Sequence, residues 1–154
     1  MKARYAVSRP SLDLASKSRL DVLISFKSES APARRRPLNI SLVIDRSGSM
    51  AGNSLKQAVK AAQGVVDRMQ PEDRLSVVIY DDSADTIVEP QLLSNRAEVR
   101  NKIGKVHAGG CMNLTGGWQK GCTHVEKHQA QDQVNRVLLL TDGQANVGVT
   151  EPVK

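Results

Sequence analysis

Apolar residues recur at every second position near the start of the chain. From Leu20 to Lys27 this period of two predicts a half-buried β-strand. We expect the segment from Ala3 to Ser8 to pair with it. A proline-bounded run of three arginines follows, and there the pattern changes. We therefore predict an N-terminal β-strand extension over residues 1–30 and a basic linker over residues 31–37.

Beyond the linker, short apolar runs alternate with a longer helical pattern. The segments Leu38 to Ile44, Leu75 to Tyr80 and Val137 to Leu140 are typical of strands buried inside a sheet. Between the first two, helical spacing of apolar residues predicts an amphipathic helix from Ser54 to Met69. Its apolar positions are Leu55, Val59, Ala62, Val66 and Met69.

Turn residues place the remaining elements. The turn at residues 81–83 predicts a hairpin whose second strand is short, from Thr86 to Val88. Ser94 predicts the N-cap of a helix that runs to Ile103. The last helix ends near His128. Its apolar stripe, which we interpret as core, comprises Leu114, Trp118, Cys122 and Val125.

This alternation of strands and helices predicts an α/β fold. We expect a Rossmann-like, mostly parallel sheet over residues 38–154, with helices on both faces. The length of 154 residues fits one such domain beside the extension. Because only 3% of the residues are aromatic, the core must be aliphatic.

Composition narrows the compartment and the partners. No apolar run is long enough to cross a bilayer, and no signal peptide is visible, so we expect a cytoplasmic protein without a membrane partner. Cys111 and Cys122 fit that compartment as free thiols. The net charge is +6, but no stacking aromatics accompany the arginine run. We therefore interpret the run as a solvated linker and do not expect a nucleic-acid partner.

Two acidic loops follow predicted strands. Residues 45–50 come after the first buried strand, and residues 141–143 come after the last. In open α/β sheets, ligands bind beyond the carboxyl ends of the strands, where the connections diverge. An Asp with two hydroxyls at alternate positions offers three hard oxygens, which suit Mg²⁺. Turn chemistry without a metal is the alternative interpretation.

These loops carry a family resemblance. Residues 45–49 (DRSGS) resemble the D-x-S-x-S signature that opens the metal-ion-dependent adhesion site (MIDAS) of von Willebrand factor A domains, which share the fold of integrin I domains. Residues 141–143 resemble the later T-D-G element of that family. Residues 109–114 resemble the loop in which a Thr precedes Asn-Leu. The likeness covers most of residues 38–150, in the family's order.

The resemblance implies a site and a function. It implies that Asp45, Ser47 and Ser49 bind a divalent cation, Mg²⁺ or else Mn²⁺ or Ca²⁺, and that Asp142 ligates it directly or through water. A protein partner presenting Asp or Glu would complete the coordination. The family also continues past its T-D-G strand. We therefore expect a sheet whose C-terminal part is missing and whose last strand is an edge open to self-association.

One position departs from the family. Met112 stands where the family carries its Thr, and a thioether is a poor ligand for Mg²⁺. We place Met112, Asn113 and Asp82 as candidate rim residues of the site, and we expect cation binding to be weak.

Three functions therefore compete. The first is metal-dependent protein recognition, and the second is a metal-independent scaffold or assembly domain with a degenerate metal site. We do not expect an enzyme, because no Ser–His or Cys–His pair is visible in the motifs. His124 and His128 lack the spacing of a zinc motif, so we interpret them as residues of a solvated helix face.

Overall fold

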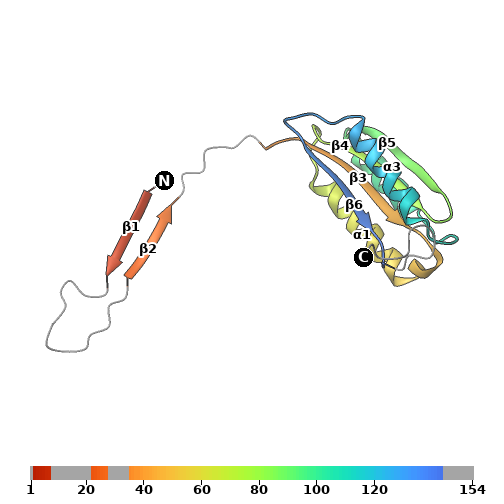
Figure 1. Cartoon of the computed structure of the whole chain (residues 1–154), viewed down its shortest axis with the longest axis horizontal. Coiled ribbons are helices and arrows are strands. Elements are labelled where there is room, and N and C mark those ends of the chain that lie inside the picture. Colours follow the sequence, from red (N-terminus) through yellow and green to blue (C-terminus); the bar gives the residue numbers. More distant parts are fainter. Residues whose placement is uncertain (1, 8–21, 28–34, 144–154) are drawn as a thin grey trace, which may run out of the picture. The chain divides into compact units, whose positions relative to one another are not determined.

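The chain divides into two compact units, residues 1–35 and 36–154. A computed structural model describes residues 2–7, 22–27 and 35–143 (Figure 1). The predicted linker over residues 31–37 lies largely outside the described residues. Within it, Arg35 and Arg36 are exposed.

The first unit contains the predicted β extension. Strands β1 (Lys2–Val7) and β2 (Val22–Lys27) pair antiparallel. Val22, Leu23 and Ile24 are all exposed, so the prediction that one face of this strand is buried is wrong for these residues. The reason is that, among its described residues, this unit has only these two strands and no further element to cover either face.

The second unit contains a four-stranded, mostly parallel sheet in the order β5-β4-β3-β6. β3 pairs in parallel with β4 and with β6, whereas β4 and β5 form the predicted antiparallel hairpin. β5 and β6 are the edges of the described sheet. The strand bounds are β3 Leu38–Asp45, β4 Arg74–Tyr80, β5 Ala84–Leu92 and β6 Val134–Leu140.

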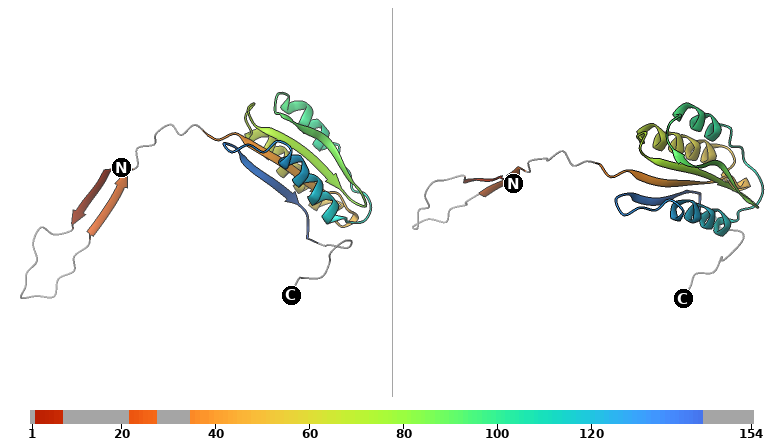
Figure 2. Two further views of the ribbon diagram at one scale, coloured as in Figure 1. Left: turned by 45° about the horizontal axis from the view of Figure 1, so that its top comes forward. Right: turned by 90° about the horizontal axis from the view of Figure 1, so that it is seen from above.

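Helices cover both faces of this sheet, which confirms the predicted fold. Helices α1 (Asn53–Arg68) and α2 (Arg96–Gly104) lie on one face, and α3 (Leu114–Glu126) lies on the other (Figure 2). None of the helices in the described ranges is long and apolar enough to cross a bilayer.

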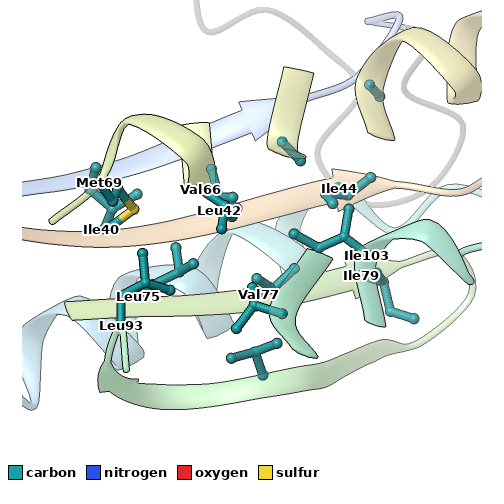
Figure 3. Close-up of a cluster of buried hydrophobic side chains, with 14 of the residues drawn as sticks. Ile40, Leu42, Ile44, Val66, Met69, Leu75, Val77, Ile79, Leu93 and Ile103 are labelled. Atoms are coloured by element: carbon teal, nitrogen blue, oxygen red, sulfur yellow. The ribbon is translucent and has the colours of Figure 1, made fainter. Parts of the chain in front are cut away.

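The larger core lies between the sheet and the α1–α2 layer (Figure 3). Alternate residues of β3 and β4 point into it and meet the apolar stripe of α1, as the helical spacing predicted. This core is aliphatic, in agreement with the low aromatic content. Its labelled members include Ile40, Leu42, Ile44, Val66, Leu75, Val77, Ile79 and Ile103.

Glycines bring α3 close to the other face of the sheet. A Cβ on Gly117 would lie 2.6 Å from ring atoms of Tyr80, and one on Gly121 would lie 2.5 Å from Val43 Cγ2. Because these glycines face the sheet, Trp118 is turned away from it and is 44% exposed. The expectation of a core Trp118 is therefore wrong.

Two boundaries differ from the sequence prediction. Asn95, and not Ser94, caps α2, because its side chain accepts the Glu98 N–H at 3.1 Å. β5 is also longer than the predicted Thr86 to Val88. It is a partly exposed edge strand containing Pro90, a composition that hides a strand from hydrophobic pattern alone.

His124 is buried between α3 and β5, so its expected place on a solvated helix face is wrong. Its Nε2 lies 3.3 Å from the Thr86 hydroxyl oxygen, and its Nδ1 has no hydrogen-bond partner among the described residues. Burial lowers the pKa of His124. Lys127, Lys120 and His128 lower it further, and Glu89 opposes them.

We expect His124 to make the domain less stable in mild acid. Because the folded-state pKa is depressed, the unfolded chain binds a proton more readily, so stability falls as the pH drops below the ordinary histidine pKa of about 6.5. His124→Gln keeps a polar group near Thr86 and removes this titration. Urea unfolding between about pH 7.5 and pH 5 should show a smaller loss of stability in the variant than in the wild type. Equal losses would contradict the assignment.

Candidate metal centre

The candidate site begins at the carboxyl end of β3. This strand lies between β4 and β6, and the helices that precede these two neighbours, α1 and α3, lie on opposite faces of the sheet, α1 leading directly from β3 toward β4. Asp45, its last residue, is fully buried. Asp45 Oδ1 accepts the Ser47 N–H at 2.9 Å, and Oδ2 accepts the hydroxyls of Tyr80 at 3.1 Å and Thr141 at 2.7 Å. Three donors from three segments therefore fix this carboxylate.

The two serines of the loop lie side by side. Ser47 precedes the short 3₁₀ helix η1 (Gly48–Met50), and Ser49 lies within it. Their Oγ atoms are 3.1 Å apart, with Ser47 buried and Ser49 exposed. Neighbouring oxygens in an octahedral Mg²⁺ shell with bonds of about 2.1 Å are about 3 Å apart. The two hydroxyls are hydrogen-bonded to each other at this separation, which is also compatible with neighbouring positions in such a shell.

Asp142 approaches the site from the end of β6. It is exposed and lies beside a hollow of about 360 Å³ that Met50, Ser54 and Thr141 also line. Its negative charge acts electrostatically on the Tyr80 hydroxyl. The pKa of Tyr80 is raised, chiefly by burial and also by the charges of Asp45 and Asp142, while the hydrogen bond to Thr141 opposes the shift. Tyr80 therefore stays a neutral donor to Asp45.

The loop after α2 closes the site on its other side. Gly48 donates its N–H to Gly110 O at 2.8 Å, and Gly109 donates to Arg46 O at 2.6 Å. Arg46 turns to Asp81, with which it forms an ion pair at 2.8 Å. A Cβ on Gly109 would collide with the Asp81 carboxylate, so only glycine fits there.

Each of the three candidate rim residues makes contacts that hold the fold: two accept backbone hydrogen bonds and the third packs in the core. Asp82 Oδ1 accepts the Cys111 N–H at 2.9 Å and so holds the glycine loop. Asn113 caps α3 by accepting the Gly116 N–H at 3.0 Å. Met112 is fully buried with Val43, Val78 and Tyr80. It therefore lies in the core and not on the rim, because an apolar thioether gains more from this packing than from the polar loop.

Sequence reasoning missed Tyr80 and Thr141 as partners of Asp45. Thr141 was visible only as part of the T-D-G element, and Tyr80 only as the last residue of an apolar strand. The available signal was a hydroxyl at the carboxyl end of each strand that flanks β3.

The donor set fits a small, hard cation. In the described ranges, no cluster of three or more His, Cys, Asp or Glu side chains could hold a metal. The segments that follow β3 and β6 offer hydroxyl and carboxylate oxygens instead, at Ser47, Ser49, Asp45 and Asp142. Such oxygens suit Mg²⁺, Mn²⁺ or Ca²⁺ better than a soft transition metal.

A mostly parallel α/β sheet with an oxygen-rich loop at its switch point defines the class of domain. The sequence profile of the von Willebrand factor type A domain matches residues 40–144. The chain therefore belongs to the von Willebrand factor type A domain family.

Curated relatives agree with this assignment. The chain is 38% identical over 115 residues to an uncharacterized protein of Synechocystis sp. (strain ATCC 27184 / PCC 6803 / Kazusa), a match that covers 75% of this chain and 27% of that protein. It is 32% identical over 126 residues to human inter-alpha-trypsin inhibitor heavy chain H3, covering 77% of this chain and 14% of the relative. The chain thus spans only a minor part of the length of these proteins.

Solved structures share the fold. The von Willebrand factor domain of the type V pili tip protein Mfa5 from Porphyromonas gingivalis matches with a TM-score of 0.64 and 25% identity, over 73% of this chain and 40% of that one. Proximal thread matrix protein 1 from the mussel byssus, in a structure with a zinc-occupied MIDAS motif, matches with a TM-score of 0.60 over 73% of this chain and 32% of that one. Its identity of 17% supports the fold alone.

Proposed function

We propose that this domain recognises a protein partner through a divalent cation held by the loop at the end of β3. The observation that carries the proposal is the paired hydroxyls of Ser47 and Ser49, 3.1 Å apart beside the fixed carboxylate of Asp45. Asp142 would add a second negative charge from the neighbouring strand end. The zinc-occupied motif of the mussel protein is a precedent for a cation in this fold.

Each residue has a distinct part in this proposal. Ser47, Ser49, Asp45 and Asp142 would hold the cation. When bound, Mg²⁺ supplies a Lewis-acidic position that a carboxylate of the partner can occupy. Tyr80 and Thr141 orient Asp45 by donating to one of its oxygens. The Arg46–Asp81 ion pair keeps a positive side chain turned away from the oxygens.

A metal-independent scaffold is the second candidate. Asp45 has its hydrogen-bond demand met by three donors of the protein itself, so a buried carboxylate is not left unsatisfied without a cation. Met112 also contributes no oxygen, which lowers the number of ligands that the protein can offer.

We also propose that the domain is not an enzyme. The Tyr80 hydroxyl is fully buried and its pKa is raised by that burial, so it is neither accessible to a substrate nor readily deprotonated to a nucleophilic phenolate. A generic phosphoester, p-nitrophenyl phosphate, should show no turnover above its uncatalysed rate in the presence of Mg²⁺. Turnover that Ser47→Ala abolishes would contradict this proposal.

Ser49→Ala tests the cation directly. Ser49 is exposed, and its side chain has one hydrogen-bond partner, so its removal should leave the fold intact. A saturating cation at 100 times its Kd stabilises a fold by about 2.7 kcal/mol, and a tenfold loss of affinity removes about 1.4 kcal/mol of that. Thermal melting with chelator and with excess Mg²⁺, Mn²⁺ or Ca²⁺ should therefore show a smaller cation-induced rise in Tm for Ser49→Ala.

Ser94→Ala is the matched control. It removes an exposed serine hydroxyl from the loop before α2 and should respond to cations as the wild type does. If the wild type itself shows no cation response, the scaffold candidate replaces the metal-dependent one.

A further inference from the structure

A groove opens beside the candidate metal centre, between α1 and the loop that follows α2. It has a volume of about 490 Å³. Leu55, Val59 and Val106 provide its apolar lining, while Lys56 and Lys60 lie along the α1 side. Grooves of this size accommodate a few side chains of a ligand or peptide.

The groove lies where polar contacts between α1 and α2 end: the two helices are joined by a hydrogen bond and an ion pair near the end of α1. Gln63 Nε2 donates to Arg100 O at 3.1 Å, and the Arg100 guanidinium pairs with Asp67. Toward the start of α1, no hydrogen bond or ion pair to α2 is present among the described residues, and the space between α1 and residues 104–108 is open. α1 and α2 lie on the same face of the sheet (Figure 2).

The groove continues toward the candidate metal centre. Gly52, two residues after the end of η1 at Met50, lines one end of it. Val106 and His107 line both this groove and a second hollow of about 350 Å³ that reaches Arg46. Because Gly52 is only three residues after Ser49, this end of the groove lies within about 11 Å of the loop at the end of β3, within reach of residues that neighbour a bound carboxylate.

The side chains that line these two hollows include lysines and an arginine as their charged groups. No carboxylate lines either hollow in the described part of the chain. Lys56, Lys60 and Lys105 have no ion-pair partner among the described residues, whereas nearby Lys102 pairs with Glu98 at 3.0 Å. The groove therefore favours an acidic occupant. Among the described residues that line it, none is Phe, Tyr or Trp, and His107 is the one ring, so the groove lacks the series of aromatic platforms on which successive nucleic-acid bases stack.

The spacing of the lysines indicates the shape of the occupant. Lys56 and Lys60 are one helical turn apart, about 6 Å along the axis. Alternate side chains of an extended peptide are about 6.6 Å apart and point the same way. An extended segment can thus present acidic residues to both lysines and turn its intervening apolar residues toward Leu55 and Val59.

We infer that this groove binds an extended segment of alternating acidic and apolar residues, from the same protein whose carboxylate the β3 loop binds. The inference rests on the proposed function for the identity of the partner. The distance from Gly52, the N-cap residue of α1, to Gln63 is about 16 Å along the helix axis, so the segment has about five residues in contact.

The test uses the full chain and a fluorescent five-residue peptide of alternating glutamate and valine, with blocked ends, in chelator. We expect the double variant K56E/K60E to bind it roughly tenfold more weakly than the wild type, because two attractions become repulsions. The control K127E/R136E makes the same change in net charge away from the groove and should bind as the wild type does. Both control positions are exposed, as are Lys56 and Lys60, so all variants should stay folded, with a small loss of stability in the control because a negative charge at the C-cap of α3 opposes the helix dipole.

Several results would overturn the inference. These are equal binding of a lysine–valine peptide, equal binding of a glutamate–serine peptide, or no binding of the glutamate–valine peptide at 1 mM, a weak affinity of about −4 kcal/mol. Sedimentation that shows a dimer abolished by K56E/K60E would instead assign the groove to a second copy of the chain.

The two proposals can fail separately. If no cation stabilises the wild type but K56E/K60E weakens peptide binding, the metal proposal fails and the groove remains. If cations stabilise the wild type and Ser49→Ala removes the effect, yet peptide binding ignores K56E/K60E, the groove alone fails.

Discussion

Gly117→Ala should lower the free energy of unfolding by about 3 kcal/mol, because overpacking a closed core forces side chains and backbone to shift. The added Cβ would lie 2.6 Å from Cγ and Cδ1 of Tyr80. This ring cannot move away freely, since its hydroxyl donates to Asp45 and its side chain is fully buried. The same substitution should therefore also displace the donor that orients Asp45.

Gly64→Ala is the matched control. Gly64 also lies within a helix, but a Cβ there would meet only the end of the Arg68 side chain, at 3.4 Å. Alanine exceeds glycine in helix propensity by about 1 kcal/mol, so this variant should be slightly more stable than the wild type. Urea unfolding of the three proteins measures the difference. Equal stabilities for the two variants would show that α3 does not approach the sheet as closely as described.

Asp45→Ala should lower stability by about 3 kcal/mol and also remove the response to cations, because buried donors lose their acceptor. The Ser47 N–H and the Tyr80 hydroxyl are enclosed by protein, so water cannot readily replace the carboxylate. Thermal melting in chelator and in excess Mg²⁺ separates the two effects.

Asp73→Ala provides the comparison. Asp73 is also fully buried, and its carboxylate accepts the N–H groups of Leu38 at 2.8 Å and Gln70 at 2.7 Å, at the opposite end of β3 from Asp45. Its loss should reduce stability by a similar amount, about 2–3 kcal/mol, but leave the rise in Tm caused by Mg²⁺ unchanged. A cation response retained by Asp45→Ala would place the binding site elsewhere.

Periodicity predicted the sheet and α1 because burial there follows a regular pattern. The stripe of Leu55, Ala62 and Val66 faces the core as expected. In α3 the apolar periodicity predicted Trp118 as a core residue, because a large apolar side chain is usually more buried than a glycine. The structure buries Gly117 and Gly121 instead, since small residues allow the helix to approach the sheet.

The chemistry of the candidate site was less visible than its position. The motif placed Asp45, Ser47 and Ser49 at a strand end, and the structure brings them together there. Their surroundings depend on residues distant in sequence. Tyr80 and Thr141 reach Asp45 only because β4 and β6 flank β3, and no local pattern contains that information.

The register of β6 has a consequence for folding fidelity. Ile44 pairs with Leu140, so Asp45 and Thr141 follow as the next residues of their strands, and the Thr141 hydroxyl reaches the carboxylate. A slip of one residue would turn every side chain of β6 to the opposite face and carry this hydroxyl away. A cation that requires the aligned oxygens would therefore bind the correctly paired sheet and not its misaligned competitors. Cation binding would thus stabilise the correct register of β3 and β6 relative to misaligned registers, in addition to forming a bridge to a partner.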